Sequence, residues 1–537
     1  SNSSTIVSTY QATSTESIAT TTTTPESSAE SETATTLVTS KTLSSSSSKT
    51  STSTSASTSA SAAASDTSSS NGYTGDLFTA ISTESPPSVF SRADLPLAIP
   101  SGVSTESPIG TNKFYANLFL GAQTDMVWTA PYGGFWKTSD YYGFAVQHTD
   151  PNSRVFGTSN TNNEDVYSYY LNPTNLGELI ISSTTLSSSS NNMFVTNMNE
   201  MSATVQLTSD STLGSNYIEI PLVQGMGFVT SIYHGSTTAV INSLVGVKTL
   251  MQETSSALNA NTLKFRATLE SGNDWLIYVT DPNKSKTKRA FKRSFDFSFD
   301  ASNPYKLIGS SSIDGLIIQY AFAPSDLTKD AYYDEAAGCY ATSASVTGSV
   351  SLGTSATYLF KYTVSGSSSS GKTIVFALPH HVASVTSTTA NANTGITLYS
   401  TTKGEMVGFL TNELSFAEEL TTDIQFLPWS LMMTGSISYT ADQLKLLAEA
   451  ANDELSVDIS LTVAGMDSNY FSGKVIDKYA YILLVVNDII GDETVAKSTL
   501  ADLKEAFAPF IANKQYYPLM YDTRWLGVTS TASQNGD

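Results

Sequence analysis

The sequence contains a single cysteine, Cys339, among 537 residues. An intramolecular disulfide is therefore impossible, and stability must come from packed cores. We expect Cys339 to be a buried structural thiol, because no motif of a cysteine nucleophile accompanies it. No apolar run is long enough to span a bilayer, and the first residues show neither the charged nor the apolar region of a secretory signal.

Basic residues are scarce: 27 Lys and Arg face 48 Asp and Glu, for a formal net charge of −21. This balance argues against nucleic acid as a partner. One basic cluster lies at residues 284–293, and it fits either an exposed hairpin tip or a processing site. Zinc-protease, phosphate-loop and nucleotide-binding motifs are absent from the sequence.

The chain divides by composition into four segments. Residues 1–75 are dominated by Ser, Thr and Ala, and we expect a disordered, O-glycosylated stalk. Residues 76–362 show short alternating runs between polar turns, which predict a large antiparallel β-sandwich. The clearest alternation, at residues 289–300, places Phe291, Phe295, Phe297 and Phe299 on one face. Oligomeric state is not indicated by any pattern.

A small α/β connecting subdomain is predicted at residues 363–430, with a strand pair at 372–378 and 395–399. From 431 to 537 the period becomes helical. Residues 440–443 read TADQ, a capping-box start, and further helices are predicted at 473–490 and 493–511. Gly491 suits the position after a helix end, and Pro509 should bend or end the last helix. A helical bundle and the start of a toroid fit this pattern equally.

Several segments resemble one family in the same order along the chain. Residues 108–121 read PIGTNKFYANLFLG after the proline-spaced LPLAIP at 95–100, and the pattern itself predicts a turn followed by a strand. Further segments are PYGGFW at 131–136, GFAVQH at 143–148 with RVFG at 154–157, PLVQGMGFVT at 221–230, FALPHH at 376–381 and YDTRW at 521–525. Together they resemble the fungal endo-1,3-β-glucanases of glycoside hydrolase family 81.

The resemblance implies endo-hydrolysis of β-1,3-glucan with inversion, in a β-sandwich followed by an (α/α)6 toroid. Inverting enzymes need two carboxyl groups about 6.5–9.5 Å apart. The family's catalytic carboxylates lie in later histidine- and glutamate-rich segments that have no counterpart here. We therefore assign no catalytic residue, expect those residues beyond Asp537, and expect the toroid to be incomplete and this chain to be inactive alone.

Other polar pairs in the sequence are weaker candidates. Glu418–Glu419 and Asp334–Glu335 are adjacent, so their side chains should diverge on a solvated face. His380 and His381 follow Pro379 at a strand end, where adjacent side chains point to opposite faces and chelate a metal poorly. We expect a structural histidine pair, or one histidine lining a sugar cleft.

Substrate contact is the local function that remains, because sugar rings stack on aromatic faces and their hydroxyls need polar partners. The candidates are Tyr521, Asp522 and Trp525, which the family resemblance places near the cleft. For Trp525, ligand contact and core packing stay equally open. Trp128, Trp136 and Trp275 are expected in the core.

The resemblance thus predicts an extracellular or cell-wall protein whose partner is β-1,3-glucan, with neither nucleic acid nor a membrane span involved. A non-catalytic glucan-binding protein and a purely structural wall protein are the alternatives. Binding of laminarin without release of reducing sugar separates the first alternative from an enzyme.

Overall fold

The computed structural model describes residues 77–78, 84–94, 97–110, 112–160, 163–167, 169–283, 295–351, 353–421 and 438–532. They belong to one compact unit that spans residues 68–537. The predicted stalk at 1–75 and the basic cluster at 284–293 lie outside the described residues, as does Phe291. Among the described helices, none combines the length and the hydropathy needed to cross a membrane.

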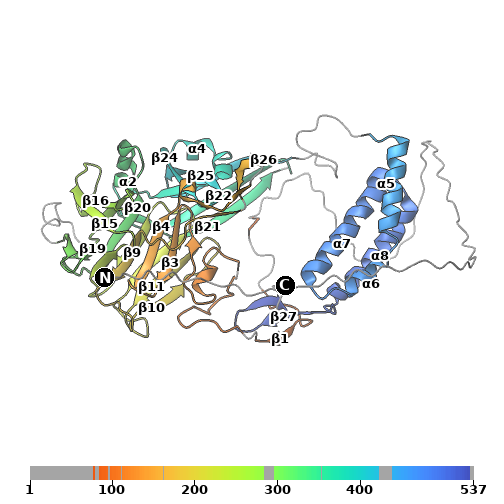
Figure 1. The fold of residues 1–537 in the computed structure, drawn as a ribbon, viewed down its shortest axis with the longest axis horizontal. Helices are drawn as coiled ribbons and strands as arrows, with labels where there is room; N and C mark the ends of the chain where they lie inside the picture. Colours follow the sequence, from red (N-terminus) through yellow and green to blue (C-terminus); the bar gives the residue numbers. More distant parts are fainter. Residues whose placement is uncertain are drawn as a thin grey trace, which may run out of the picture. The chain divides into compact units, whose positions relative to one another are not determined.

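The first large antiparallel sheet of the described region has eight strands in the order β10-β11-β12-β13-β20-β17-β16-β15 (Figure 1). Its strands are β10 Asn192–Thr196, β11 Ser202–Thr208, β12 Ile218–Val223, β13 Val229–Tyr233, β15 Val247–Glu253, β16 Thr262–Leu269, β17 Asp274–Thr280 and β20 Leu316–Phe322. Most positions of β11, β13, β17 and β20 are buried, so both faces of the sheet's centre are covered.

The second large antiparallel sheet has seven strands in the order β18-β19-β14-β9-β4-β3-β2. Its strands are β2 Val127–Trp128, β3 Tyr132–Lys137, β4 Gly143–His148, β9 Leu179–Ser183, β14 Ala239–Asn242, β18 Phe297–Asp300 and β19 Asn303–Gly309. A two-stranded pair, β5 Val155–Phe156 with β8 Tyr170–Leu171, and another, β6 Ser159–Asn160 with β7 Asn163–Tyr167, follow β4 in the chain.

The two large sheets share one hydrophobic core. Tyr132 of β3 packs its ring 5.7 Å from that of Trp275 of β17, and its hydroxyl donates a hydrogen bond to the Gly227 carbonyl at 3.0 Å. Tyr233 of β13 donates likewise to the Ser182 carbonyl of β9 at 3.1 Å. Buried phenols need such partners. The mostly β, antiparallel character predicted for this part is confirmed.

The alternating phenylalanines are buried only in part. Phe295 and Phe297 are 2% and 7% exposed, whereas Phe299 is 41% exposed. Phe297 and Phe299 lie two residues apart on β18, the spacing for which one face was predicted. Phe299 is the more exposed because β18 is the edge strand of its sheet and Phe299 lies next to a register irregularity against β19.

The predicted strand within residues 108–121 is also wrong. The described residues form turns and a 3-10 helix, Ala116–Leu118. Tyr115, Leu118 and Phe119 are buried on one side of it, a spacing of three to four residues that a strand does not give. The Asn117 amide donates to the Met126 carbonyl at 2.7 Å and fixes the turn.

Smaller elements follow the large sheets. One sheet has the order β21-β22-β26, with bounds Cys339–Ser351, Ser355–Gly366 and Glu413–Glu419; another has the order β23-β25-β24, with bounds Ile374–Ala377, Gly404–Leu410 and Asn393–Ser400. The short helices are α2 Asp330–Ala336, α3 Pro379–Val382 and α4 Ser387–Ala390. Both strands of the predicted pair exist, but they are not direct partners, because β25 lies between them.

Cys339 is buried, as predicted, and burial raises the pKa of its thiol.

The C-terminal described region, 438–532, is mainly helical. Its helices are α5 Ala441–Glu454, α6 Ile459–Ala464, α7 Asn469–Leu484, the π-helical turn Val485–Ile490 and α8 Glu493–Ile511. The capping box is confirmed at Thr440 and Gln443, and Gly491 ends the π-helical turn with a left-handed φ of 76°. The predicted bounds of α8 match, and Pro509 lies in its last turn. Leu446, Leu461 and Ile511 are 65%, 71% and 80% exposed, so apolar helix surface lies uncovered.

Candidate functional site

The three predicted contact residues lie on or beside a small sheet at the end of the described chain. Its strands are β1 Ser91–Ala93, β27 Leu519–Asp522 and β28 Gly527–Ser530. β1 pairs with β27 in parallel, which brings Ser91 opposite Met520 and Ala93 opposite Asp522. A segment that precedes the β-sheets thus pairs with one that follows the helices.

Asp522 is 1% exposed and shapes the turn after β27. Its Oδ1 accepts hydrogen bonds from the backbone N–H groups of Arg524 at 2.8 Å and Trp525 at 2.7 Å. This is the side-chain-to-backbone pattern by which aspartate stabilises turns. The carboxylate therefore has a structural role in this arrangement, and contact with a sugar stays a prediction.

Trp525 is 5% exposed and joins the hydrophobic core shared by the two sheets. Its indole Nε1–H donates to the Leu97 carbonyl at 2.9 Å, its own carbonyl accepts from Ile109 N–H at 3.1 Å, and its ring lies 6.0 Å from that of Phe119. The sequence left ligand contact and core packing open for Trp525, and these contacts support core packing.

Tyr521 is partly exposed, and its ring faces the guanidinium of Arg92, whose Cζ lies 5.1 Å from the ring centroid. Arg92 is held by hydrogen bonds to the carbonyls of Pro87 at 3.1 Å and Phe90 at 2.6 Å. A cation over one face leaves the aromatic ring oriented rather than freely rotating. Among the three predicted residues, Tyr521 has the greatest access to solvent.

The segment that contains β1 also contacts the large sheets. Gly102 O accepts from Val195 N–H at 2.9 Å, and Ser104 N–H donates to Val195 O at 3.0 Å. The Tyr115 hydroxyl donates to the Asn199 carbonyl at 2.7 Å. The described residues between 84 and 119 therefore form a strap with contacts to both the β-sheets and the region that follows the helices.

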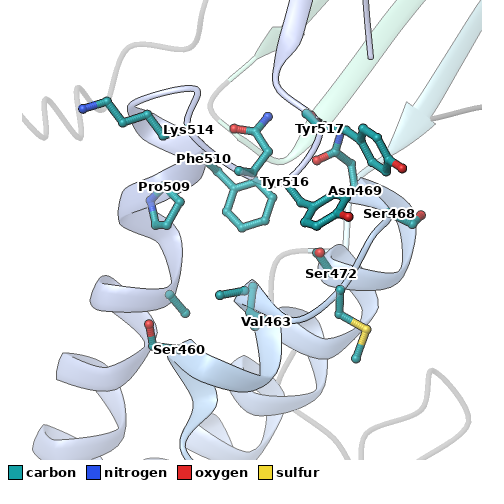
Figure 2. Close-up of a pocket in the computed structure, with 14 residues that line it drawn as sticks. Ser460, Val463, Ser468, Asn469, Ser472, Pro509, Phe510, Lys514, Tyr516 and Tyr517 are labelled. Atoms are coloured by element: carbon teal, nitrogen blue, oxygen red, sulfur yellow. Dashed lines mark hydrogen bonds between the residues drawn. The ribbon is translucent and has the colours of Figure 1, made fainter. Parts of the chain in front are cut away.

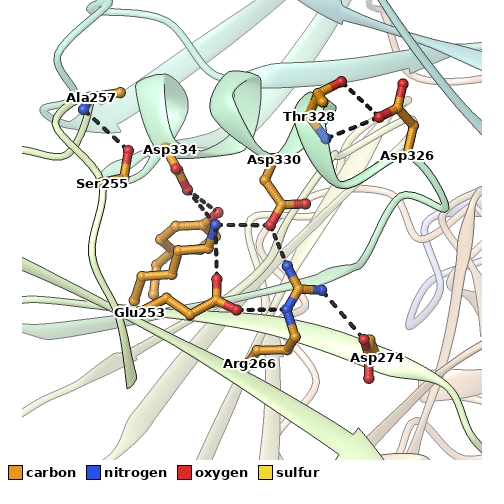
Figure 3. A network of polar contacts seen from close by, with 11 residues as sticks. Glu253, Ser255, Ala257, Arg266, Asp274, Asp326, Thr328, Asp330 and Asp334 are labelled. Atoms are coloured by element: carbon orange, nitrogen blue, oxygen red, sulfur yellow. Dashed lines mark hydrogen bonds and ion pairs between the residues drawn. The ribbon is translucent and has the colours of Figure 1, made fainter. Parts of the chain in front are cut away.

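A buried charge network, which the sequence analysis missed, fastens α2 to the eight-stranded sheet (Figure 3). Lys264 Nζ of β16 lies 2.9 Å from Asp330 Oδ2 and 3.0 Å from Asp334 Oδ1, and all three residues are at most 6% exposed. Arg266 Nε lies 2.7 Å from Glu253 Oε1, and Arg266 also contacts Asp330.

The pKa values in the network follow from its pairing. Burial alone would lower the pKa of Lys264, but the hydrogen bond from Lys264 to Asp330 and the nearby carboxylate charges outweigh burial and raise it. Burial alone would raise the pKa of Glu253, but the hydrogen bond from Arg266 and the charge of Lys264 lower it. The prediction of a solvated pair at Asp334–Glu335 is wrong for Asp334, which also accepts from the Tyr278 hydroxyl at 2.7 Å. Each charged side chain of the network has an oppositely charged partner within it, although Asp330 Oδ1 itself has no hydrogen-bond partner among the described residues. The network therefore has the character of a structural anchor.

The described histidines lie apart, except for one pair. His148 is buried and packs 4.5 Å from Phe322, and burial lowers the pKa of its imidazole. His380 and His381 lie on helix α3 with ring centroids 4.0 Å apart, so the prediction that they occupy opposite faces of a strand end is wrong. Burial, and then the charge of His380, lowers the pKa of His381 to about 4.

Metal ligands do not gather elsewhere in the described ranges: no group of three or more His, Cys, Asp or Glu side chains there could hold a metal ion. Glu418 and Glu419 are exposed, as predicted. Glu418 accepts hydrogen bonds from the Ser384 hydroxyl at 2.8 Å and the Tyr358 hydroxyl at 3.2 Å.

Comparison with known proteins agrees with the order of the segments described above. Residues 95–431 match the glycosyl hydrolase family 81 N-terminal domain, and residues 438–537 match the glycosyl hydrolase family 81 C-terminal domain.

The chain belongs to glycosyl hydrolase family 81.

Three curated relatives support the family assignment. Glucan endo-1,3-beta-D-glucosidase 2 of Saccharomyces cerevisiae is 35% identical over 460 residues, which cover 84% of this chain and 56% of the relative. The primary septum glucan endo-1,3-beta-D-glucosidase of Schizosaccharomyces pombe is 34% identical, with 86% and 42% covered. The glucan endo-1,3-beta-D-glucosidase of Arthroderma benhamiae is 32% identical, with 86% and 50% covered. The chain therefore spans about half the length of these family 81 relatives.

Two features of this family 81 chain escaped the sequence analysis. The charge network joins β16 to α2, which are more than sixty residues apart, and isolated Lys and Asp residues do not predict such a pairing. The strap brings described residues between 84 and 119 together with residues beyond 510. The one sequence feature that could have indicated this contact is the density of amide and aromatic side chains in 108–121.

Proposed function

We propose that this chain is part of a secreted endo-1,3-β-glucanase that hydrolyses internal β-1,3-glucosidic bonds of cell-wall glucan with inversion. The observation that carries the proposal is the match of both family 81 domains, in order, over residues 95–431 and 438–537. The three relatives named as glucan endo-1,3-glucosidases support the bond type. One of them is named for the primary septum, which favours an extracellular or cell-wall location.

In this proposal the parts of the chain have different tasks. The segment at 76–362 is the β-sandwich domain, 363–430 is the α/β connector, and the helices from 431 onward are the first members of an (α/α)6 toroid. The β part braces the helices. The parallel pairing of β1 with β27 and the burial of Trp525 in the sheet core support this bracing, because they connect segments from both ends of the described region.

We infer that the residues present here do not catalyse hydrolysis by themselves. An inverting enzyme needs one carboxyl group that stays protonated, which desolvation favours, and a second that activates water. In the described helical region, 438–532, the aspartates and glutamates are exposed except for Asp492 and Asp522. Asp492 caps α8 through Oδ1, and Asp522 shapes a turn. These roles leave no acid–base pair in that region.

Among the carboxyl groups of the β part that the structure describes, Glu178 has the surroundings that most resemble those of an acid catalyst. Burial raises its pKa. However, its Oε2 accepts from the His148 backbone N–H at 2.9 Å and its Oε1 from the Asn273 amide. A carboxyl group enclosed between strands in this way positions backbone and does not meet a polysaccharide.

Substrate contact at Tyr521, with Asp522 and Trp525 behind it, remains part of the proposal. The aromatic ring would meet an apolar sugar face, while Asp522 and Trp525 hold the turn that presents it. Hydrolysis by two carboxyl groups and water needs no cofactor.

The test is co-sedimentation of the 537-residue chain with insoluble β-1,3-glucan, with cellulose as the matched control. We expect the chain to sediment with β-1,3-glucan and to stay in the supernatant with cellulose. Equal recovery with both polymers would contradict recognition of the β-1,3 linkage. Absence from both pellets would favour the structural wall protein instead.

A further inference from the structure

Two pockets in the described part of the chain differ in their chemistry. The first is a cavity of about 280 Å³ lined by residues from α6, the start of α7, the end of α8 and the loop that follows α8 (Figure 2). The charged residue in its lining is Lys514, which points away from the rings of Phe510 and Tyr516 in Figure 2. The neutral groups that remain do not select one class of ligand.

The second pocket has a volume of about 360 Å³ and lies in the β part. Its lining comes from the loop between β10 and β11, from β11 and β12, and from the first half of β21. The volume falls within the ~300–1,000 Å³ of typical small-molecule sites. Glu219 of β12 is the charged residue of the lining. The pocket therefore has the size for a small ligand and carries one negative charge.

Glu219 lacks a cationic partner in the part of the chain that the structure describes. Its side chain is 28% exposed, and its Oε2 lies 3.8 Å from His234 Nε2, which is longer than a hydrogen bond. The imidazole of His234 is stacked on the ring of Tyr217, with centroids 4.3 Å apart and planes at 21°. A partly buried carboxylate without a cation has lost hydration and gained no ion pair, so a ligand that brings a cation would be bound favourably.

The charge of Glu219 acts on two neighbouring phenols. Burial, and then the charge of Glu219, raises the pKa of Tyr340 to about 12. Burial, followed by the charges of Glu219 and Asp314, also raises the pKa of Tyr217. A negative charge that extends to both phenols is consistent with a carboxylate that no neighbouring cation neutralises.

A register shift in β21 brings two adjacent hydroxyl-bearing residues to the pocket. Ala341 lies opposite Val364 and Ser343 opposite Thr363, so Thr342 is an extra residue on β21. Adjacent side chains of a regular strand point to opposite faces, whereas a bulge re-aims them. Thr342 and Ser343 accordingly both line the pocket.

The opposite wall is built from amides that are fixed in place. Asn197 has a left-handed φ of 51°, and its Nδ2 donates to Thr204 Oγ1 at 3.3 Å. The Oδ1 of Asn199 accepts from the backbone N–H groups of Met201 at 3.0 Å and Ser202 at 2.9 Å. Asn197, Asn199 and Thr204 all line the pocket. Polar groups therefore surround the space beside Glu219.

We propose that this pocket binds an amino sugar, with the Glu219 carboxylate as the counter-ion of the ammonium group. The amides and hydroxyls of the lining match the hydroxyls of the sugar, and Met198 and Pro221 offer apolar contact to its C–H groups. A lysine side chain carries the same charge on a long alkyl stem, for which a mostly polar lining is poorly suited. The inference does not rest on the proposed function, because β-1,3-glucan carries no charge and gives Glu219 no partner.

The experiment measures binding of glucosamine to the 537-residue chain by isothermal titration calorimetry at neutral pH. N-acetylglucosamine, which lacks the charge, should bind about tenfold more weakly. Glu219→Gln keeps the side chain's size and removes its charge, and we expect glucosamine to bind this variant about tenfold more weakly. Ser343→Ala removes one lining hydroxyl, and we expect binding about threefold weaker.

Glu449→Gln is the matched control for charge. It removes one negative charge from α5, where the Glu449 side chain is 60% exposed and does not line the pocket. Its affinity for glucosamine should equal that of the unaltered chain. This control separates a site at Glu219 from general attraction of a cation to a chain of net charge −21.

A stability readout distinguishes a binding role from a structural one. Since Glu219 has no cation to lose, the urea midpoint of Glu219→Gln should stay unchanged or rise while glucosamine binding weakens. A lower midpoint would make Glu219 a structural partner of its neighbours and would overturn the inference. So would equal affinity for glucosamine and N-acetylglucosamine, unchanged affinity in Glu219→Gln, or no binding by the unaltered chain.

Nα-acetyl-lysine amide provides the last comparison. If it binds as tightly as glucosamine, the pocket reads an ammonium group on any stem, and the assignment to an amino sugar is overturned in favour of a basic peptide. Sedimentation with β-1,3-glucan tests the proposed function separately, because that polymer has no amine.

Discussion

The buried network around Lys264 offers the sharpest test of how the β part is held together. Lys264→Met preserves most of the side chain's volume and removes the ammonium. Arg266 would still neutralise Asp330 and Glu253, with its Nε 2.7 Å from Glu253 Oε1. Asp334, 4% exposed, would keep only the Tyr278 hydroxyl as a donor among the contacts described above. A buried carboxylate that loses its cation costs about 3–5 kcal/mol.

The measurement is the free energy of unfolding in a urea titration. Unfolding is monitored by the circular dichroism signal of β-structure. For a slope of about 3 kcal/mol per molar urea, the midpoint should fall by at least about 1 M. Lys306→Met is the matched control in the same part of the chain. Lys306 Nζ lies 3.1 Å from Asp300 Oδ2, but the two side chains are 31% and 18% exposed, so we expect the urea midpoint to change little.

A double variant separates the charge from the packing. Asp334→Asn added to Lys264→Met removes the uncompensated carboxylate and should recover part of the lost stability. If Lys264→Met unfolds at the same urea concentration as Lys306→Met, the network does not anchor α2 and the electrostatic reasoning is refuted.

Three further predictions concern other parts of the molecule. Trp525→Ala should lower the free energy of unfolding by about 3–5 kcal/mol, because the side chain is 5% exposed and donates a hydrogen bond to the Leu97 carbonyl. Trp128, which is partly exposed, provides the control. A urea midpoint for Trp525→Ala equal to that of Trp128→Ala would contradict the placement of Trp525 in the core. His381 has a folded pKa of about 4, below its ordinary value of 6.5, so its contribution to stability is present above pH 6.5 and is lost as the pH falls through about 4. His381→Phe should flatten the dependence of the urea midpoint on pH in that window, and identical slopes for the two proteins would contradict the shift. Tyr521→Ala should weaken laminarin binding about three- to tenfold without changing the urea midpoint, and full retention of affinity would remove Tyr521 from the contact site.

Local signals in the sequence predicted much of the helical region. Thr440 with Gln443 fixes the start of α5, Gly491 marks the end of the π-helical turn, and the apolar period gives the bounds of α8. Each of these helix boundaries depends on residues within one or two helical turns, so local sequence is enough to predict it. The short helix α6 was missed because its six residues hold too few positions for a period to emerge.

Contacts distant in sequence account for what was missed or wrong. Phe299 fits the alternating pattern but lies on an edge strand, where it is exposed. The residue spacing within one strand does not predict the order of strands in the sheet. Residues 114–120 have strand-like composition, yet their packing against Trp525 and the sheets favours a 3-10 turn. The role of Trp525 itself depended on Leu97 and Ile109, more than four hundred residues away.

We infer that these family 81 residues recognise β-1,3-glucan and that the part of the chain described by the structure lacks an assembled acid–base pair. The most direct measurement is release of reducing ends from laminarin by the purified 537-residue chain, made on the same preparation that is tested for sedimentation with insoluble β-1,3-glucan. We expect sedimentation with the polymer and no reducing ends above the protein-free blank. Steady release of reducing ends in proportion to protein concentration would contradict it.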